Sequence, residues 1–433
     1  MVLEPRDPVA RRTPQARGIW ARLASLVVCA VIPIGVTGCA SSEPDASTSS
    51  GLDGTTSPVG EPAPGMPDLM AELVGLPDAA GIDTFAVWIC AVPLDTTDPT
   101  WAGRSLRLPL SPAHVVSRAG ERLAEYFSAL SHGTYTVELR AGGTIELEPD
   151  ESSEDCVQRA ITATSDAAGG RDAGDDAVEA VLAVADAEHV EGVAGGWGTA
   201  GERATCGDDC PVGESHRAAY VGASDFHPDW GPVPALDLLE HEIGHTLGLP
   251  HSGSAAEGEA EYSSALDVMS DSAAPRDVDP SRLDAPDTLG IDRLALGWLP
   301  AKAVVAAPDA PGAVLDVPLS PSTGTTGTRL LVLPVTEDEV VTVELLVPVG
   351  FDAHLPAAGI AVHLIDAVGR PVTDRRQVAV GTPPFTDLAG PGDVVEAGGW
   401  SIEVTTLDER GEDPAGAIAS VRVVRLAAEV TGG

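Results

Sequence analysis

Three histidines and one glutamate occur together in the sequence HEIGHTLGLPH, which begins at His241. Residues four apart share one face of a helix, so His241 and His245 would direct a ring nitrogen at the same ion, with Glu242 beside it. A left-handed glycine at Gly248 would end the helix and turn the chain back. His251 would then fill a third protein position and leave the fourth to water. The spacing therefore predicts a hydrolytic zinc site.

The chemistry of such a site needs a Lewis acid and a proton acceptor. A bound zinc ion polarises a peptide carbonyl and lowers the pKa of a water molecule to about 7. Glu242 would take the proton from this water and pass it to the departing amine.

The alternative is an amphipathic helix with incidental histidines. Pro234 suits a first helical turn, and Leu238, Leu239 and Leu247 would bury the helix against a sheet.

A methionine follows this motif in the segment Leu266-Asp267-Val268-Met269-Ser270. The histidine and glycine pattern, followed by this methionine, resembles the metzincin zinc peptidases. The resemblance implies a twisted sheet, an active-site helix and Met269 in a turn beneath the zinc ion. Some metzincins carry a tyrosine two residues after that methionine, where this chain has Asp271. We expect Tyr262, which lies nearby in the sequence, to be a packing residue.

Two further segments resemble the gametolysin and immune inhibitor A groups of secreted peptidases. The first is LALGWL at 294–299, and the second comprises FDAHLP at 351–356 with GIAVH at 359–363. The resemblance covers about residues 77 to 370 and is strongest around the zinc motif. It implies one catalytic Zn²⁺ ion and a protein or peptide substrate.

The N-terminus has the pattern of an export signal. A basic segment precedes an apolar run from Leu23 to Val36, which is too short for an ordinary membrane-spanning helix. The sequence Val-Thr-Gly-Cys then ends at Cys39 and resembles a bacterial lipobox. The resemblance implies that residues 1–38 are a lipoprotein signal peptide, and that lipid on Cys39 anchors the exported chain to the outer face of the bacterial cell membrane. A plain secretory signal is the alternative.

The charge balance is strongly acidic. The chain has 25 lysines and arginines against 66 aspartates and glutamates, a formal net charge of −41. Nucleic acid and anionic lipid headgroups would be repelled, so we expect no nucleic-acid partner. The acidic surface could attract calcium, but no ordered calcium-loop pattern supports a calcium site. The favoured explanation for the excess of acidic residues is that they keep an anchored protein soluble.

Four cysteines would remain in the body of the mature protein: Cys90, Cys156, Cys206 and Cys210. An exported location favours disulfides, and we expect Cys206 to pair with Cys210 and Cys90 with Cys156. A second zinc ion held by Cys206, Cys210 and His216 is the alternative.

The remaining chain divides into three expected parts. Residues 39–80 are rich in serine, proline, glycine and threonine and fit a flexible tether. Residues 81–300 show the order of an α/β (α+β) catalytic domain, and residues 301–433 show short β-like runs typical of a β-sandwich. Within the catalytic domain, strands are expected at 84–92, 134–139, 144–147, 190–193 and 218–221, and helices at 113–130 and 175–187. In the last part, strands are expected at 329–335, 340–346, 359–365, 400–405 and 419–426.

Three polar residues that precede the zinc motif, Asp225, His216 and His227, are expected to have surface or loop roles, because the three histidine ligands already suffice. The sequence thus predicts a lipid-anchored zinc endopeptidase. Two alternatives stay open: an inactive zinc-containing binding or scaffold module at the cell surface, and a zinc hydrolase acting on a non-peptide amide.

Overall fold

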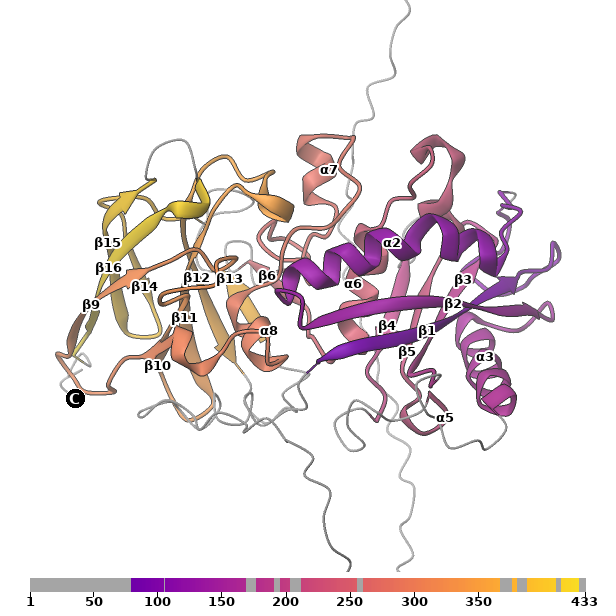
Figure 1. Cartoon of the computed structure of the whole chain (residues 1–433), viewed down its shortest axis with the longest axis horizontal. Coiled ribbons are helices and arrows are strands. Elements are labelled where there is room, and N and C mark those ends of the chain that lie inside the picture. Colours follow the sequence, from indigo (N-terminus) through magenta and orange to yellow (C-terminus); the bar gives the residue numbers. More distant parts are fainter. Residues whose placement is uncertain are drawn as a thin grey trace, which may run out of the picture. The chain divides into compact units, whose positions relative to one another are not determined.

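The structure is a computed structural model of the whole chain (Figure 1). It describes residues 79–104, 106–168, 177–190, 195–202, 212–254, 260–366, 376–379, 388–409 and 414–427. All of these lie in one compact unit, residues 58–433. Within these ranges no helix is both long and apolar enough to cross a membrane. The predicted signal peptide, Cys39 and the tether up to residue 78 lie outside the described residues, as do Cys206 and Cys210.

The first half of the described chain forms a mixed α/β layer structure around a five-stranded sheet. The strand order is β2-β1-β3-β5-β4, and only β4 runs antiparallel to its neighbour. The strands are β1 (Gly81–Ala91), β2 (Tyr135–Glu146), β3 (Ala180–Ala185), β4 (Gly196–Thr199) and β5 (Ala218–Val221). β4 is therefore an edge strand, and it lies next to the segment that carries the histidine motif.

Helices cover both faces of this sheet (Figure 1). One core joins α2 (Pro112–Leu130) and α6 (Asp237–Thr246) to the sheet, and it includes the buried side chains of Phe127 and Ile243. A second core joins α3 (Ser153–Ala168) to the opposite face. The helix α2 begins as its sequence predicts, with Ser111 accepting a hydrogen bond from the N–H of His114 and a proline in the first turn. Shorter helices are α5 (Val212–Ser215), α7 (Ala274–Val278) and α8 (Gly290–Ala295).

The helix predicted over residues 175–187 is wrong. Residues 177–179 are coil, and 180–185 form β3, which pairs with β1 and β5 and whose side chains are all buried. Alanine, leucine and valine in a continuous run suit a parallel strand covered on both faces as well as they suit a helix, and periodicity cannot separate the two. The helix on this side is α3, which precedes the strand. The two strands predicted at 134–139 and 144–147 form one strand, β2.

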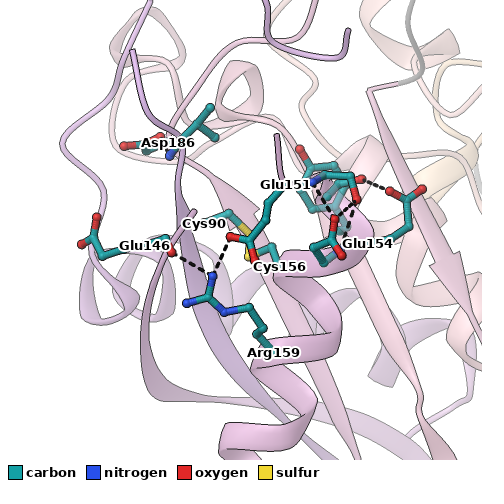
Figure 2. The surroundings of a disulfide bond; sticks show 12 residues. Cys90, Glu146, Glu151, Glu154, Cys156, Arg159 and Asp186 are labelled. Carbon is teal, nitrogen blue, oxygen red and sulfur yellow. Dashed lines mark hydrogen bonds and ion pairs between the residues drawn. A yellow bond between two sulfur atoms is a disulfide. The ribbon is translucent and has the colours of Figure 1, made fainter. Parts of the chain in front are cut away.

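A disulfide joins β1 to α3 through Cys90 and Cys156, which confirms this predicted pair. Both residues are buried, in the core on the α3 side of the sheet. Close to the bond, Arg159 of α3 donates to the backbone carbonyl of Glu146 and to the carboxylate of Glu151 (Figure 2). The covalent link and these bonds hold α3 against the ends of β1 and β2.

The second half is built from two sheets. One has seven strands in the order β7-β6-β13-β12-β11-β10-β8, and the other has four in the order β14-β15-β16-β9. Buried side chains from both sheets form one core around Trp400 and Leu333. The five strands predicted from the sequence are present as β10 (Leu330–Pro334), β11 (Glu339–Leu346), β12 (Gly359–Asp366), β15 (Trp400–Asp408) and β16 (Ile418–Arg425). The others in this part are β8 (Val304–Ala306), β9 (Val314–Leu319), β13 (Arg376–Ala379) and β14 (Val394–Ala397).

The seven-stranded sheet also recruits the chain that follows the histidine motif. The strand β6 (Ser252–Ser254) pairs in parallel with β13, and β7 (Ala260–Glu261) pairs with β6. Residues 252–254 and 260–261 thus extend a sheet formed largely by residues beyond 303. The two halves of the described chain meet at the histidine motif.

Candidate metal centre

The three predicted histidine ligands converge. One ring nitrogen each from His241, His245 and His251 can be chosen so that all three lie within 4.8 Å of one another. His241 and His245 come from α6, one turn apart, and His251 follows the turn after the helix. Gly248 has φ +91°, the left-handed conformation that the sequence predicted for this turn. The helix itself begins at Asp237, after Pro234 rather than with it in the first turn.

Backbone carbonyls set the proton positions on two of the rings. Nδ1 of His241 lies 2.7 Å from the carbonyl oxygen of Val268, and Nδ1 of His245 lies 2.8 Å from that of Leu249. A carbonyl can only accept, so each Nδ1 carries the proton and each Nε2 keeps its lone pair for a ligand bond. Nε2 of His245 also lies 2.8 Å from Nε2 of His251. The lone pairs of these rings thus face a shared point.

The rings are uncharged in this setting. Burial, together with the neighbouring histidines, lowers the pKa of His241 to about 3 and that of His251 to about 4. Burial also lowers the pKa of His245. Neutral imidazole is the form that binds a metal ion. Three neutral nitrogen donors at this separation fit a zinc ion with one position left open.

Glu242 lies on the same helix and is buried. Its Oε2 has no hydrogen-bond partner among the described residues, and burial with the nearby charge of Asp225 raises its pKa to about 8. The edge strand β4 leaves space for the Glu242 side chain because Gly196 has no side chain of its own. A Cβ placed at Gly196 would lie 2.8 Å from Glu242 Oε1. In the metal-free chain this carboxyl group is therefore mostly protonated at neutral pH. A bound cation beside the three rings would favour its ionised form, whose unengaged oxygen is suited to accept a proton.

Met269 is fully buried, and its sulfur lies against α6. A Cβ at Gly244 would lie 2.6 Å from its sulfur, so the absence of a side chain on this turn of α6 lets Met269 pack against the helix. The carbonyl of Met269 accepts a hydrogen bond from the N–H of Ser252, the residue after the third histidine.

Tyr262 is not the packing residue that the sequence suggested. Its side chain is 51% exposed, its φ is +59°, and its phenol oxygen lies 2.9 Å from Nε2 of His251. The ring also stacks edge-on against His251. Nothing in the sequence signalled this position, because β6 and β7 bring Tyr262 back to the histidines from a segment without a recognisable pattern.

Asp225 differs from its expected surface or loop role as well. It is buried, one carboxylate oxygen has no hydrogen-bond partner among the described residues, and burial together with the charge of Asp237 raises its pKa to about 8. Asp237 forms an ion pair with Arg276 at 2.6 Å. Asp225 therefore belongs to a buried acidic group next to Glu242. His216 is exposed and His227 is partly exposed, as expected.

Comparisons with known proteins add little to this geometry. No protein-family model matches the sequence, and no curated protein matches it. One solved structure that aligns is metalloproteinase-II from Bacteroides fragilis, at 16% identity and a TM-score of 0.25, over 46% of this chain and 53% of that one. Another is a chaperone–substrate complex, at 15% identity and a TM-score of 0.26, over 51% of this chain and 35% of that one. The chain thus spans about half and about a third of the lengths of these two chains. At such low TM-scores neither similarity bears on function.

Proposed function

We propose that this chain is a zinc endopeptidase of metzincin type, related to the gametolysin and immune inhibitor A groups. The observation that carries the proposal is the convergence of three neutral imidazoles beside the buried carboxylate of Glu242. His241, His245 and His251 would hold the ion. When bound, zinc supplies Lewis-acid chemistry and lowers the pKa of a water molecule to about 7.

The residues of the chain would do the remaining work. Glu242 accepts the proton of the attacking water and returns it to the departing amine, since its Oε2 is not engaged elsewhere among the described residues. The backbone of β4 lies beside Glu242, and its outer edge would pair with an extended peptide and align the scissile bond. The Tyr262 hydroxyl, next to His251, would donate to the oxygen on which negative charge develops.

We further propose that the enzyme works outside the cytoplasm. The lipobox-like sequence that ends at Cys39 supports export and attachment by lipid to the outer face of the membrane. The disulfide between Cys90 and Cys156 supports an oxidising compartment. Residues 301–433 would serve as a β-sandwich-like accessory domain.

The test measures bound zinc and peptide cleavage on the purified full chain. We expect one zinc ion per chain and cleavage of a protein-derived peptide mixture that a chelator abolishes. Glu242→Gln should keep the zinc ion and lose cleavage by about 10²–10⁴-fold, because only the proton acceptor is removed. His241→Ala should lose the zinc ion as well.

Other results would point elsewhere. A wild-type chain that holds zinc but cleaves no peptide would contradict the endopeptidase and favour a binding module or a hydrolase of non-peptide amides. A chain that binds no zinc would remove the basis of the whole proposal.

A further inference from the structure

One short turn, residues 267–269, touches both parts of the chain that carry the histidines. The carbonyl of Val268 accepts a hydrogen bond from Nδ1 of His241, and the carbonyl of Met269 accepts one from the N–H of Ser252. The first bond reaches α6, and the second reaches β6 directly after His251. The turn therefore links the two elements whose relative position decides whether the triad can close around an ion.

The side chain of Asp267 adds a third bond to this link. It is fully buried, and its Oδ2 accepts a hydrogen bond of 2.5 Å from the hydroxyl of Ser252. Its Oδ1 lies 3.4 Å from the hydroxyl of Thr288. Ser252 is thus held through its backbone and its side chain at once, which fixes the direction from which His251 enters the site. A hydrogen bond in a buried place is stronger and more directional than an exposed one.

The turn is itself anchored to the second half of the molecule. The N–H of Val268 donates to the carbonyl of Asp287, and the N–H of Asp287 donates to the carboxylate of Asp352. His354 lies 2.9 Å through Nε2 from the carbonyl of Ala265. Asp352 and His354 belong to the FDAHLP segment noted in the sequence. This segment therefore supports the turn on which the triad depends.

We propose that Asp267 is a positioning residue for the metal centre, acting on His251 through Ser252. This inference rests on the proposed zinc site. Without the carboxylate, β6 keeps its backbone bond to Met269 and His251 keeps its contact with Tyr262, but the bond that fixes the Ser252 side chain is lost. His251 would then be held less firmly at the convergence point. Loss of an outer-shell partner commonly lowers metal affinity by about 10–100-fold.

The experiment titrates the metal-free full chain with zinc against a competing chelator, and records the visible absorption of the Co²⁺-loaded protein. We expect Asp267→Ala and Ser252→Ala each to weaken zinc binding by about 10–100-fold. The double variant should be no weaker than the worse single variant, because both changes break one bond. Asp267→Asn keeps a carbonyl acceptor for the Ser252 hydroxyl and should bind zinc within about threefold of wild type.

The control is Asp186→Ala. Asp186, directly after β3, accepts a hydrogen bond from the N–H of Val92, and among the described residues it contacts neither the triad nor the turn. Its loss should therefore affect folding but leave zinc affinity and the Co²⁺ spectrum unchanged. Equal zinc affinity in wild type, Asp267→Ala and Ser252→Ala would overturn the positioning role while leaving the proposed function intact. Additive losses in the double variant would also overturn it. If Asp267→Ala does not fold, Ser252→Ala and Asp267→Asn still decide the question.

Discussion

Three imidazoles that each place a ring nitrogen within 4.8 Å of the others cannot all carry charge in a buried place, and this constraint shapes the chemistry of each residue in the site. Burial lowers the pKa of His241 to about 3, so the ring stays neutral over the physiological range. The carbonyls of Val268 and Leu249 then fix which nitrogen holds the proton. A metal ion would meet preformed donors and would displace no proton from them at neutral pH.

The Tyr262 hydroxyl gives the first prediction at this scale. Tyr262→Phe removes one oxygen and leaves the ring that stacks on His251. We expect zinc content to be unchanged, KM to change little and kcat to fall by about 10²–10³-fold, the usual cost of losing one donor to a developing negative charge. Steady-state kinetics on a cleaved peptide, with zinc measured in parallel, check this. An unchanged kcat would show that the hydroxyl takes no part in turnover.

The sequence predicts the site residues that lie close together in the chain. It does not predict the site residues that only folding brings together. The ligands and Glu242 share one helix and the turn after it, so their spacing alone predicts a common site. Tyr262 and Asp225 reach the site through β6–β7 and through the turn before α6. No periodic pattern in the sequence predicts these two positions, because each depends on pairing with distant strands or on a short irregular segment.

Close contact between β4 and α6 governs the site at the scale of elements. A Cβ at Gly198 would lie 2.2 Å from the carbonyl oxygen of Glu242 and 2.7 Å from Cβ of His245. The first of these atoms belongs to the backbone of α6, and the second is bonded directly to that backbone. Neither can move aside unless α6 shifts. The glycines in the Gly-Trp-Gly sequence of β4 are therefore a condition for the approach of this strand to the helix.

Gly198→Ala should consequently disturb both stability and the metal site. We expect the free energy of unfolding to fall by about 1–3 kcal/mol, as for other overpacked sites, and zinc affinity to fall with it. The matched control is Gly120→Ala in α2, where the nearest atom to a new Cβ is 3.8 Å away and alanine favours the helix. Denaturant unfolding and zinc titration of both variants provide the measurement. A Gly198→Ala variant as stable as Gly120→Ala would show that the strand yields easily.

The segment predicted as a helix but found as β3 shows that some residue patterns do not distinguish a helix from a strand. Residues 180–185 are buried on both faces as β3, and a run without alternation carries no information about which regular structure it forms. The edge strand β7 and its neighbour β6 have only two and three residues and no pattern at all. In contrast, α2 has a capping serine, a proline in its first turn and regular apolar spacing, and its predicted bounds differ by one residue from those observed.

At the scale of the whole molecule, the two halves meet over a buried acidic layer. Among the described residues, five carboxyl groups and one guanidinium group make up this layer: Asp267, Asp287, Asp292, Glu344, Asp352 and Arg293. Arg293 forms an ion pair with Asp287, and both oxygens of Glu344 lie near 3 Å from the N–H of Gly290. One guanidinium cannot balance five ionised carboxylates in a buried place, so some of the carboxyl groups hold protons in the folded chain.

Glu344 gives this layer a measurable effect on stability. Burial raises its pKa from 4.5 to about 7, although Gly290, Arg293 and Ser322 favour the ionised form and Asp292 opposes it. Because the folded-state pKa is raised, the contribution of Glu344 to stability is complete below about pH 4.5 and is lost as pH rises to about 7. A shift of this size corresponds to about 3 kcal/mol.

We therefore expect the free energy of unfolding of the metal-free chain to decrease between pH 4.5 and 8, and to decrease by about 3 kcal/mol less in Glu344→Gln, which has no proton to lose. Burial raises the pKa of Asp267 and of Asp352 as well, and the charge of Glu344 adds to both shifts, so the difference between the two proteins measures Glu344 together with its effect on these two carboxyl groups. Urea unfolding at several pH values measures it, with Glu121→Gln on the exposed face of α2 as the control. Parallel curves for wild type and Glu344→Gln would mean that Glu344 is already ionised in the folded chain, and that the protons of the acidic layer reside on its other carboxyl groups.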